Sequence, residues 1–160
     1  MATRRNQEQV SKWRSEVIEG MISVEWYMNA VICQHYFNRV DRSFWLDVLY
    51  NEQFSFGLRR SIVERIPGKD WQDLRRMGTI RNLFAHCDIE LIDIRGGVLG
   101  QPRMPDPRKP EKDVDFAALF ADFKEKRGPV EQELLNLYRK LGGKFTFRDR
   151  LTGREEKGGA

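Results

Sequence analysis

The sequence predicts a mainly helical protein with one small β-hairpin before its last helix. Three observations lead to this prediction. Apolar residues recur every three or four positions over most of the 160-residue chain, the spacing of one helical face. Capping residues precede these stretches, and glycine or proline follows them. A short apolar run with glycines at its centre, typical of two paired strands, interrupts the helical pattern only once.

The composition describes a single globular domain. Hydrophobic residues make up 40% of the chain and charged residues 32%, which excludes a wholly disordered protein. We expect one domain over residues 1–143 and a flexible polar tail over residues 144–160. The net charge of +4 permits a polyanionic partner such as RNA, but it is far below the charge of a protein that coats nucleic acid.

The two cysteines, Cys33 and Cys87, lie in apolar contexts and cannot form the paired clusters of a structural zinc site. We therefore predict two reduced thiols, no metal and no cofactor. The first residues lack the apolar core of a leader, and no apolar run approaches membrane-spanning length. The expected location is the cytoplasm, with no membrane partner.

The first half of the chain predicts three helices. A long one covers residues 7–38, with glycine at position 20 marking a bend, and its apolar face comprises Val10, Trp13, Val17, Met21, Val24, Met28 and Val31. Asp41 or Ser43 caps a short helix through Trp45 and Leu49. A third helix covers residues 56–66 and ends at a Pro-Gly pair.

The second half predicts two more helices around a hairpin. Asp70 caps a helix that ends near His86, with its apolar face formed by Trp71, Leu74, Met77, Ile80 and Phe84. Residues 89–94 and 98–99 form strands around Gly96-Gly97. Pro102, Pro105, Pro107 and Pro110 then predict an extended basic loop. The last helix begins after Asp113 or Asp115, continues with a kink through Gly128-Pro129, and stops at Gly142-Gly143.

The one credible chemical centre is residues 81–86. Arg81 lies in the middle of the apolar arc of its helix, where a guanidinium needs a carboxylate, a second subunit or an anionic ligand. Glu25 is the natural carboxylate. His86 follows five residues later. An arginine that stabilises charge on phosphorus and an imidazole that transfers protons are the fewest groups that metal-independent RNA cleavage needs. The alternative is a buried ion pair at Arg81 and a structural histidine at the helix end.

Proton transfer at both the attacking and the leaving oxygen normally takes two groups, and a two-fold dimer would supply a second His86. The other histidine, His35, is better explained as a core or interface residue. Four further arginines could follow a phosphate backbone, although such residues are more often solvated helix surface. They are Arg59, Arg60, Arg75 and Arg76.

The hexapeptide Arg-Asn-Leu-Phe-Ala-His at 81–86 resembles the signature of the HEPN superfamily, in which an arginine, a polar residue and a histidine follow one another in this way. The variant looks closest to the mannitol operon repressor-like and uncharacterised Arg-Asn-x-x-Ala-His HEPN families. The resemblance implies a bundle of four to five helices and a homodimer. It also implies a metal-independent endoribonuclease of a toxin or defence system, leaving 2′,3′-cyclic phosphate ends, with Arg81 and His86 catalytic and Asn82 orienting the site.

The same resemblance allows a second function. Many HEPN proteins are catalytically silent and act as regulators through protein contacts, with a cognate antitoxin or a regulatory protein as partner. Such a module would have Arg81 fully engaged by Glu25 and His86 directed away from any groove. An enzyme would instead present both side chains to one basic cleft.

Overall fold

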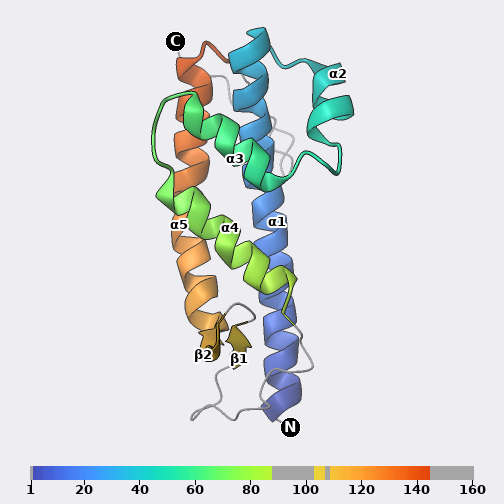
Figure 1. Cartoon of the computed structure of the whole chain (residues 1–160), viewed down its shortest axis with the longest axis vertical. Coiled ribbons are helices and arrows are strands. Elements are labelled where there is room, and N and C mark those ends of the chain that lie inside the picture. Colours follow the sequence, from blue (N-terminus) through green and yellow to red (C-terminus); the bar gives the residue numbers. More distant parts are fainter. Residues whose placement is uncertain (1, 88–102, 107–108, 145–160) are drawn as a thin grey trace, which may run out of the picture.

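The computed structural model describes residues 2–87, 103–106 and 109–144, and this part of the chain is mainly helical (Figure 1). The predicted fold class is confirmed at this level. In chain order the elements are α1 Ala2–Phe37, α2 Arg42–Phe44, the π-helical turn η1 Trp45–Leu49, α3 Phe56–Arg65, α4 Gln72–Ala85, β1 Arg103–Asp106, β2 Lys109–Asp115 and α5 Phe116–Lys140.

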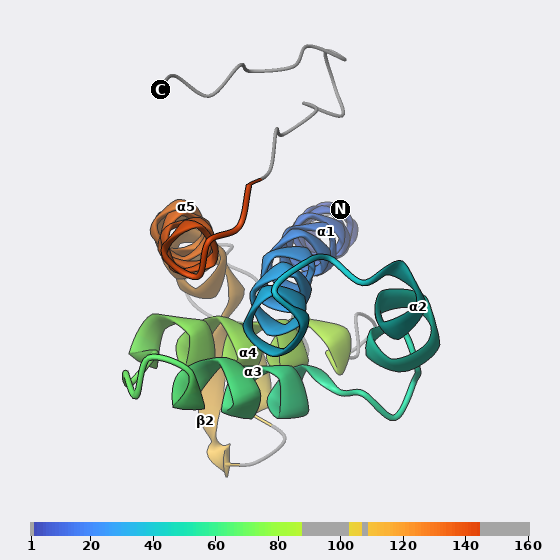
Figure 2. The ribbon, with the colours of Figure 1, turned by 90° about the horizontal axis from the view of Figure 1, so that it is seen from above.

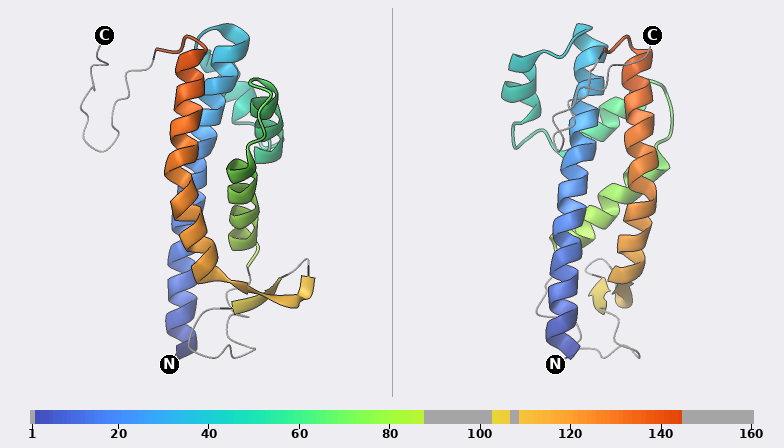
Figure 3. Two further views of the ribbon diagram at one scale, coloured as in Figure 1. Left: turned by 90° about the vertical axis from the view of Figure 1, so that its left-hand side faces the viewer. Right: turned by 180° about the vertical axis from the view of Figure 1, so that it is seen from behind.

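The long helices α1 and α5 lie side by side and run in the same direction, and α3 and α4 cross one face of this pair (Figure 2). The α2–η1 segment stands out from the bundle on the side of α1 away from α5 (Figure 3). The strands lie at the N-terminal end of α5 (Figure 1). Because α4 crosses the pair obliquely, its last turn lies beside the N-terminal half of α1 (Figure 1).

The core lies between the α1–α5 pair and α4. The predicted apolar face of α4 is buried, and Phe84 packs edge-on against Phe116 at 5.2 Å between ring centroids. Gly20 is where α1 and α5 approach closely, since a Cβ there would lie 2.9 Å from Phe123 Cε1. The helix α1 is continuous through Gly20, so this glycine serves close packing.

Most predicted helix ends are confirmed by their capping bonds. Asp41 accepts a hydrogen bond from the Phe44 N–H, Ser55 from Leu58 and Asp115 from Ala118, which satisfies free N–H groups at three helix starts. At the end of α5, Gly142 has a φ of 89° and donates to Arg139 O, while Gly143 donates to Tyr138 O. These two bonds form a Schellman motif. As predicted, α5 continues through Gly128-Pro129.

The predicted cap of α4 is wrong. Trp71 occupies the N-cap position without a side-chain hydrogen bond, and the Asp70 carboxylate instead lies 3.1 Å from Arg75 Nη2. An ion pair across the first turn thus replaces the expected capping bond.

The predicted hairpin at residues 89–99 lies outside the described residues, as do Pro102, Pro107 and the tail after residue 144. The prediction of an extended loop over the proline-rich segment is wrong, because much of this segment forms strands. β1 and β2 pair antiparallel, with Arg103 opposite Asp115 and a register irregularity after Pro105. Both strands of a two-stranded sheet are edges, where proline is tolerated.

Across the described residues, none of the helices combines the length and apolar character needed to cross a membrane.

Candidate functional site at the end of α4

The last two turns of α4 carry the predicted motif. Arg81 and Asn82 lie inside the helix, and His86 is the C-cap residue, whose backbone N–H donates to Asn82 O at 3.1 Å. The His86 side chain is exposed, whereas Arg81 and Asn82 are half-buried. The end of the helix therefore carries an accessible imidazole five residues after a partly desolvated guanidinium, about 140° further round an ideal helix.

The predicted ion pair between Glu25 and Arg81 is wrong. Glu25 lies 3.4 Å from Arg59 Nη1. The Arg81 guanidinium instead donates from Nη1 to the side-chain oxygen of its neighbour Asn82, at 3.0 Å. Asn82 thus orients Arg81 without neutralising its charge.

In the part of the chain whose burial is described, Arg59 is the buried arginine, which corrects its expected place on the solvated surface. Its side chain is 7% exposed, and burial lowers its pKa although Glu25 acts in the opposite direction. It donates to Asn29 Oδ1 at 2.9 Å and to the backbone oxygens of Leu49 and Phe54. A sequence signal exists, because positions 56, 59, 63 and 66 share one helical stripe whose other members are apolar.

Arg14 is a member of the site that sequence reasoning missed. Its Nη2 donates to the Ala85 backbone oxygen at 3.1 Å, so a side chain of α1 holds the carbonyl end of α4. A cation at this end also compensates the negative pole of the helix. The available signal was its position on α1 between Val10 and Val17, four residues after one core residue and three before another.

The charge balance distinguishes this site from other arginine clusters of the molecule. In the described part of the chain, four arginines are half-buried: Arg14, Arg60, Arg81 and Arg127. Arg60 lies 3.6 Å from Glu64, and Arg127 lies 2.9 Å from Glu131. Neither Arg14 nor Arg81 has a carboxylate partner within residues 2–87, 103–106 and 109–144. Arg81, inside α4, and Arg14, which binds the last carbonyl of that helix, are thus two partly desolvated cations without a carboxylate partner in the described part of the chain.

The remaining candidates lie elsewhere. His35 is exposed, so of its two expected places, core or interface, the core is wrong; its ring centroid lies 4.8 Å from that of Tyr36. It lies about 20 residues beyond Arg14 on α1, or about 30 Å at 1.5 Å per residue. Arg75 and Arg76 pair with Glu64 and Asp122. Among the described residues, no three His, Cys, Asp or Glu side chains group as a metal site would require.

Comparisons with protein-family models, curated proteins and solved structures find no match to this chain.

Proposed function

We propose that this chain is a homodimeric HEPN-type protein that cleaves RNA without a metal, at the end of α4. The observation that carries the proposal is that two half-buried arginines at the end of α4, Arg81 and Arg14, have no carboxylate partner among the described residues, while the C-cap residue of this helix is an exposed His86. A buried ion pair at Arg81 would have favoured a silent module. The engagement of Glu25 by Arg59 supports the alternative in which Arg81 serves an anionic substrate.

The proposed chemistry needs two proton transfers and one site of charge stabilisation. A neutral His86 imidazole removes the proton of the 2′-hydroxyl, whose oxygen attacks the adjacent phosphorus. Arg81 stabilises the negative charge on the phosphoryl oxygens in the transition state. An imidazolium then protonates the departing 5′-oxygen. The products are a 2′,3′-cyclic phosphate and a 5′-hydroxyl.

The second proton-transfer group comes from a second subunit in this proposal. The chain has two histidines, and His35 lies too far along α1 to serve the same phosphate. A two-fold axis beside the end of α4 would bring His86 and the partner's His86 to one phosphate. The dimer is thus part of the proposed active site.

A regulator that acts through protein contacts is the second candidate. The observation in its favour is a set of exposed large apolar side chains on α1, η1, α3 and the adjoining turns. These are Ile22, Tyr36, Phe37, Leu46, Val48, Tyr50 and Leu58. Those that lie together would form an apolar contact area for a cognate antitoxin, a regulatory protein or a second copy. Either function places the protein in the cytoplasm.

The test is cleavage of labelled single-stranded RNA in chelator by the wild type and three variants. We expect His86→Ala and Arg81→Ala to lower the cleavage rate at least about 100-fold, the usual effect of removing an acid–base or charge-stabilising group. His35→Ala is the matched control and should cleave at the wild-type rate. Products should carry 2′,3′-cyclic phosphate ends.

Two outcomes would reject the nuclease assignment. In one, the folded wild type cleaves none of the RNA substrates, both as purified and after any co-purified partner has been removed. The other is cleavage that His86→Ala and His35→Ala retain equally, which would indicate a contaminating nuclease. In the first case the regulator becomes the preferred function.

A further inference from the structure

The chain around His86 is held by contacts on both sides of that residue. The last carbonyl groups of a helix have no partner within it, and α4 has two of them satisfied by side chains. Ala85 O accepts a hydrogen bond from Arg14 Nη2 at 3.1 Å, and Phe84 O accepts one from Cys87 Sγ, also at 3.1 Å. Since Cys87 is buried, it anchors the chain directly after His86. The end of α4 is thus fixed, whereas helix ends commonly fray.

The peptide group between Ala85 and His86 is held at both of its polar atoms. Its N–H, which belongs to His86, donates to Asn82 O at 3.1 Å, and its oxygen accepts from Arg14. A peptide group is planar and the plane includes the following Cα, so contacts at both polar atoms fix the Cα of His86. One contact comes from α4 itself and the other from α1. The position of His86 therefore depends on how α1 and α4 meet.

The imidazole of His86 has only this backbone to position it. The side chain is exposed and, among the residues that the structure describes, makes neither a hydrogen bond nor an ion pair. An acid–base group must lie within hydrogen-bond reach of the proton that it transfers, and a displacement of about 1 Å can lower a rate about 100-fold. A contact that fixes the Cα of His86 would thus act on the rate of proton transfer.

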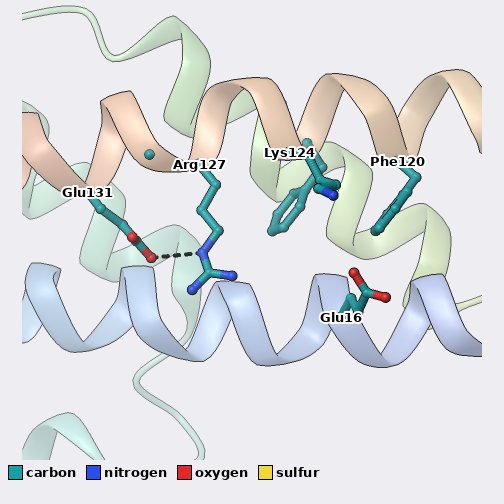
Figure 4. Close-up of a pocket in the computed structure, with 7 residues that line it drawn as sticks. Glu16, Phe120, Lys124, Arg127 and Glu131 are labelled. Carbon is teal, nitrogen blue, oxygen red and sulfur yellow. Dashed lines mark hydrogen bonds and ion pairs between the residues drawn. The ribbon is translucent and has the colours of Figure 1, made fainter. Parts of the chain in front are cut away.

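The groove between α1 and α5 lies on the other side of α1. Glu16 extends into this groove from α1, and Arg127 extends into it from α5 (Figure 4). Because two residues correspond to about 200° of rotation on a helix, Arg14 leaves α1 away from the groove, toward Ala85 of α4. Lys12 is exposed and, two residues before Arg14, leaves α1 away from Ala85 as well. It is therefore a matched control for Arg14.

We propose that Arg14 is a positioning residue for the RNA cleavage proposed above. From α1 it holds the peptide between Ala85 and His86, so that the imidazole lies where it can take the proton of the 2′-hydroxyl. This role rests on the proposed function and goes beyond it, because α1 then takes part in the reaction. Arg14 itself does not contact the RNA, which separates its role from that of Arg81.

The first measurement is steady-state cleavage of labelled single-stranded RNA by the full chain and three variants. Arg14→Ala should lower kcat about 10- to 100-fold, because a displaced imidazole transfers protons less well, and should leave KM within about twofold. Arg14→Lys keeps a charged donor for Ala85 O and should recover most of this loss. Lys12→Ala should keep the wild-type kcat.

The dependence of cleavage on salt separates positioning from RNA binding. If Arg14 contacted a phosphate, its removal would raise KM, and the slope of log KM against log salt concentration would fall by about one. The loss of a positioning residue leaves this slope unchanged. Arg14→Ala should therefore show the salt dependence of the wild type.

Amide hydrogen exchange tests the contact without RNA. The His86 N–H should exchange at least about tenfold faster in Arg14→Ala than in the wild type, because the last turn of α4 loses a hydrogen bond from a charged donor. The amide of Met77, in the middle of α4, should exchange equally in both proteins. Lys12→Ala should leave both amides as they are in the wild type.

The results distinguish a failure of this role from a failure of the proposed function. The role of Arg14 would be overturned by a wild type that cleaves RNA while Arg14→Ala keeps its kcat, changes only KM, or exchanges the His86 amide at the wild-type rate. If the wild type cleaves no RNA, the proposed function fails. Faster exchange of the His86 amide in Arg14→Ala would then show a structural tie between α1 and α4 with no part in catalysis.

Discussion

At the scale of residues, Arg59 and Arg81 show what a helical pattern can and cannot predict. Both positions lie on apolar stripes, so the pattern locates a guanidinium on an inward face. It does not tell which carboxylate the crossing of helices brings near. The packing of α3 on α1 brings Glu25 within 3.4 Å of Arg59 Nη1. The Arg81–His86 segment was predictable because it is local, whereas Arg14 joins it only through the tertiary fold.

The first prediction concerns Arg59. Arg59→Ala should lower the free energy of unfolding by about 3–5 kcal/mol, because it leaves a carboxylate and several buried acceptors without a donor. Urea unfolding followed by circular dichroism measures this change. Arg65→Ala, at an exposed position of the same helix, should change stability by less than about 0.5 kcal/mol. Equal effects of the two substitutions would contradict the buried role of Arg59.

The second prediction contrasts two glycines in helices. Gly20→Ala should destabilise the protein by about 1–3 kcal/mol, because the new methyl group meets the Phe123 ring. Gly128→Ala should stabilise it by about 0.5–1 kcal/mol, because its Cβ meets nothing and alanine favours the helix. Thermal and urea unfolding of both variants measure whether the free energy of unfolding falls for Gly20→Ala and rises for Gly128→Ala. Effects of the same sign would show that the α1–α5 contact at Gly20 can relax.

At the scale of elements, helix ends set by local chemistry were predictable and pairings between elements were not. Asp41 and Asp115 cap their helices as expected, since a cap depends on the next three residues. The start of α4 differs because Asp70 pairs with Arg75. The strands β1 and β2 were missed because Pro105 and Pro110 obscure the strand pattern, and only pairing along an edge accommodates them.

The third prediction tests how α4 is tied to α5. Burial alone would raise the pKa of Asp122, but hydrogen bonds from Arg76 and Lys126 outweigh it and hold the pKa below its ordinary value. A carboxyl with a lowered pKa stabilises the fold fully above its unfolded pKa of about 3.9, and this contribution disappears as pH falls through the folded value.

Asp122→Asn should therefore cost about 1 kcal/mol at pH 7, as expected for a partly exposed ion pair with two partners. The difference from wild type should shrink below about pH 4. Urea unfolding between pH 7 and pH 2 measures it. Glu125→Gln, at an exposed position of the same helix, is the control and should follow the wild type throughout. If the difference in unfolding free energy between Asp122→Asn and wild type did not change with pH, the ionised Asp122 carboxylate would not be its cause.

At the scale of the whole molecule, the helical architecture follows from the apolar periodicity, whereas the dimer and its active site are proposals. The fourth prediction separates two ways in which a dimer could act. If each cleavage needs both His86 side chains, mixed dimers with one His86→Ala subunit are inactive. An equal mixture of wild type and variant, after subunit exchange, should then retain about a quarter of the activity of the same number of wild-type dimers, by random pairing.

If each subunit cleaves alone, the equal mixture should retain about half. Subunits carrying different affinity tags allow the mixed dimer to be isolated and assayed directly. A chain that sediments as a monomer at assay concentrations while cleaving RNA would remove the need for a second His86.

The way in which Arg59 holds residues 49–54 has a consequence for chemical complementation. One planar cation bridges Asn29, Leu49 and Phe54, so the rigidity of that segment depends on a group that a small molecule can replace. Arg59→Ala leaves a vacancy with the shape and hydrogen-bonding pattern of guanidinium. Free guanidinium at low millimolar concentration should therefore stabilise this variant by mass action while leaving the wild type unchanged. A denaturant in one protein would act as a specific ligand in its single-site variant.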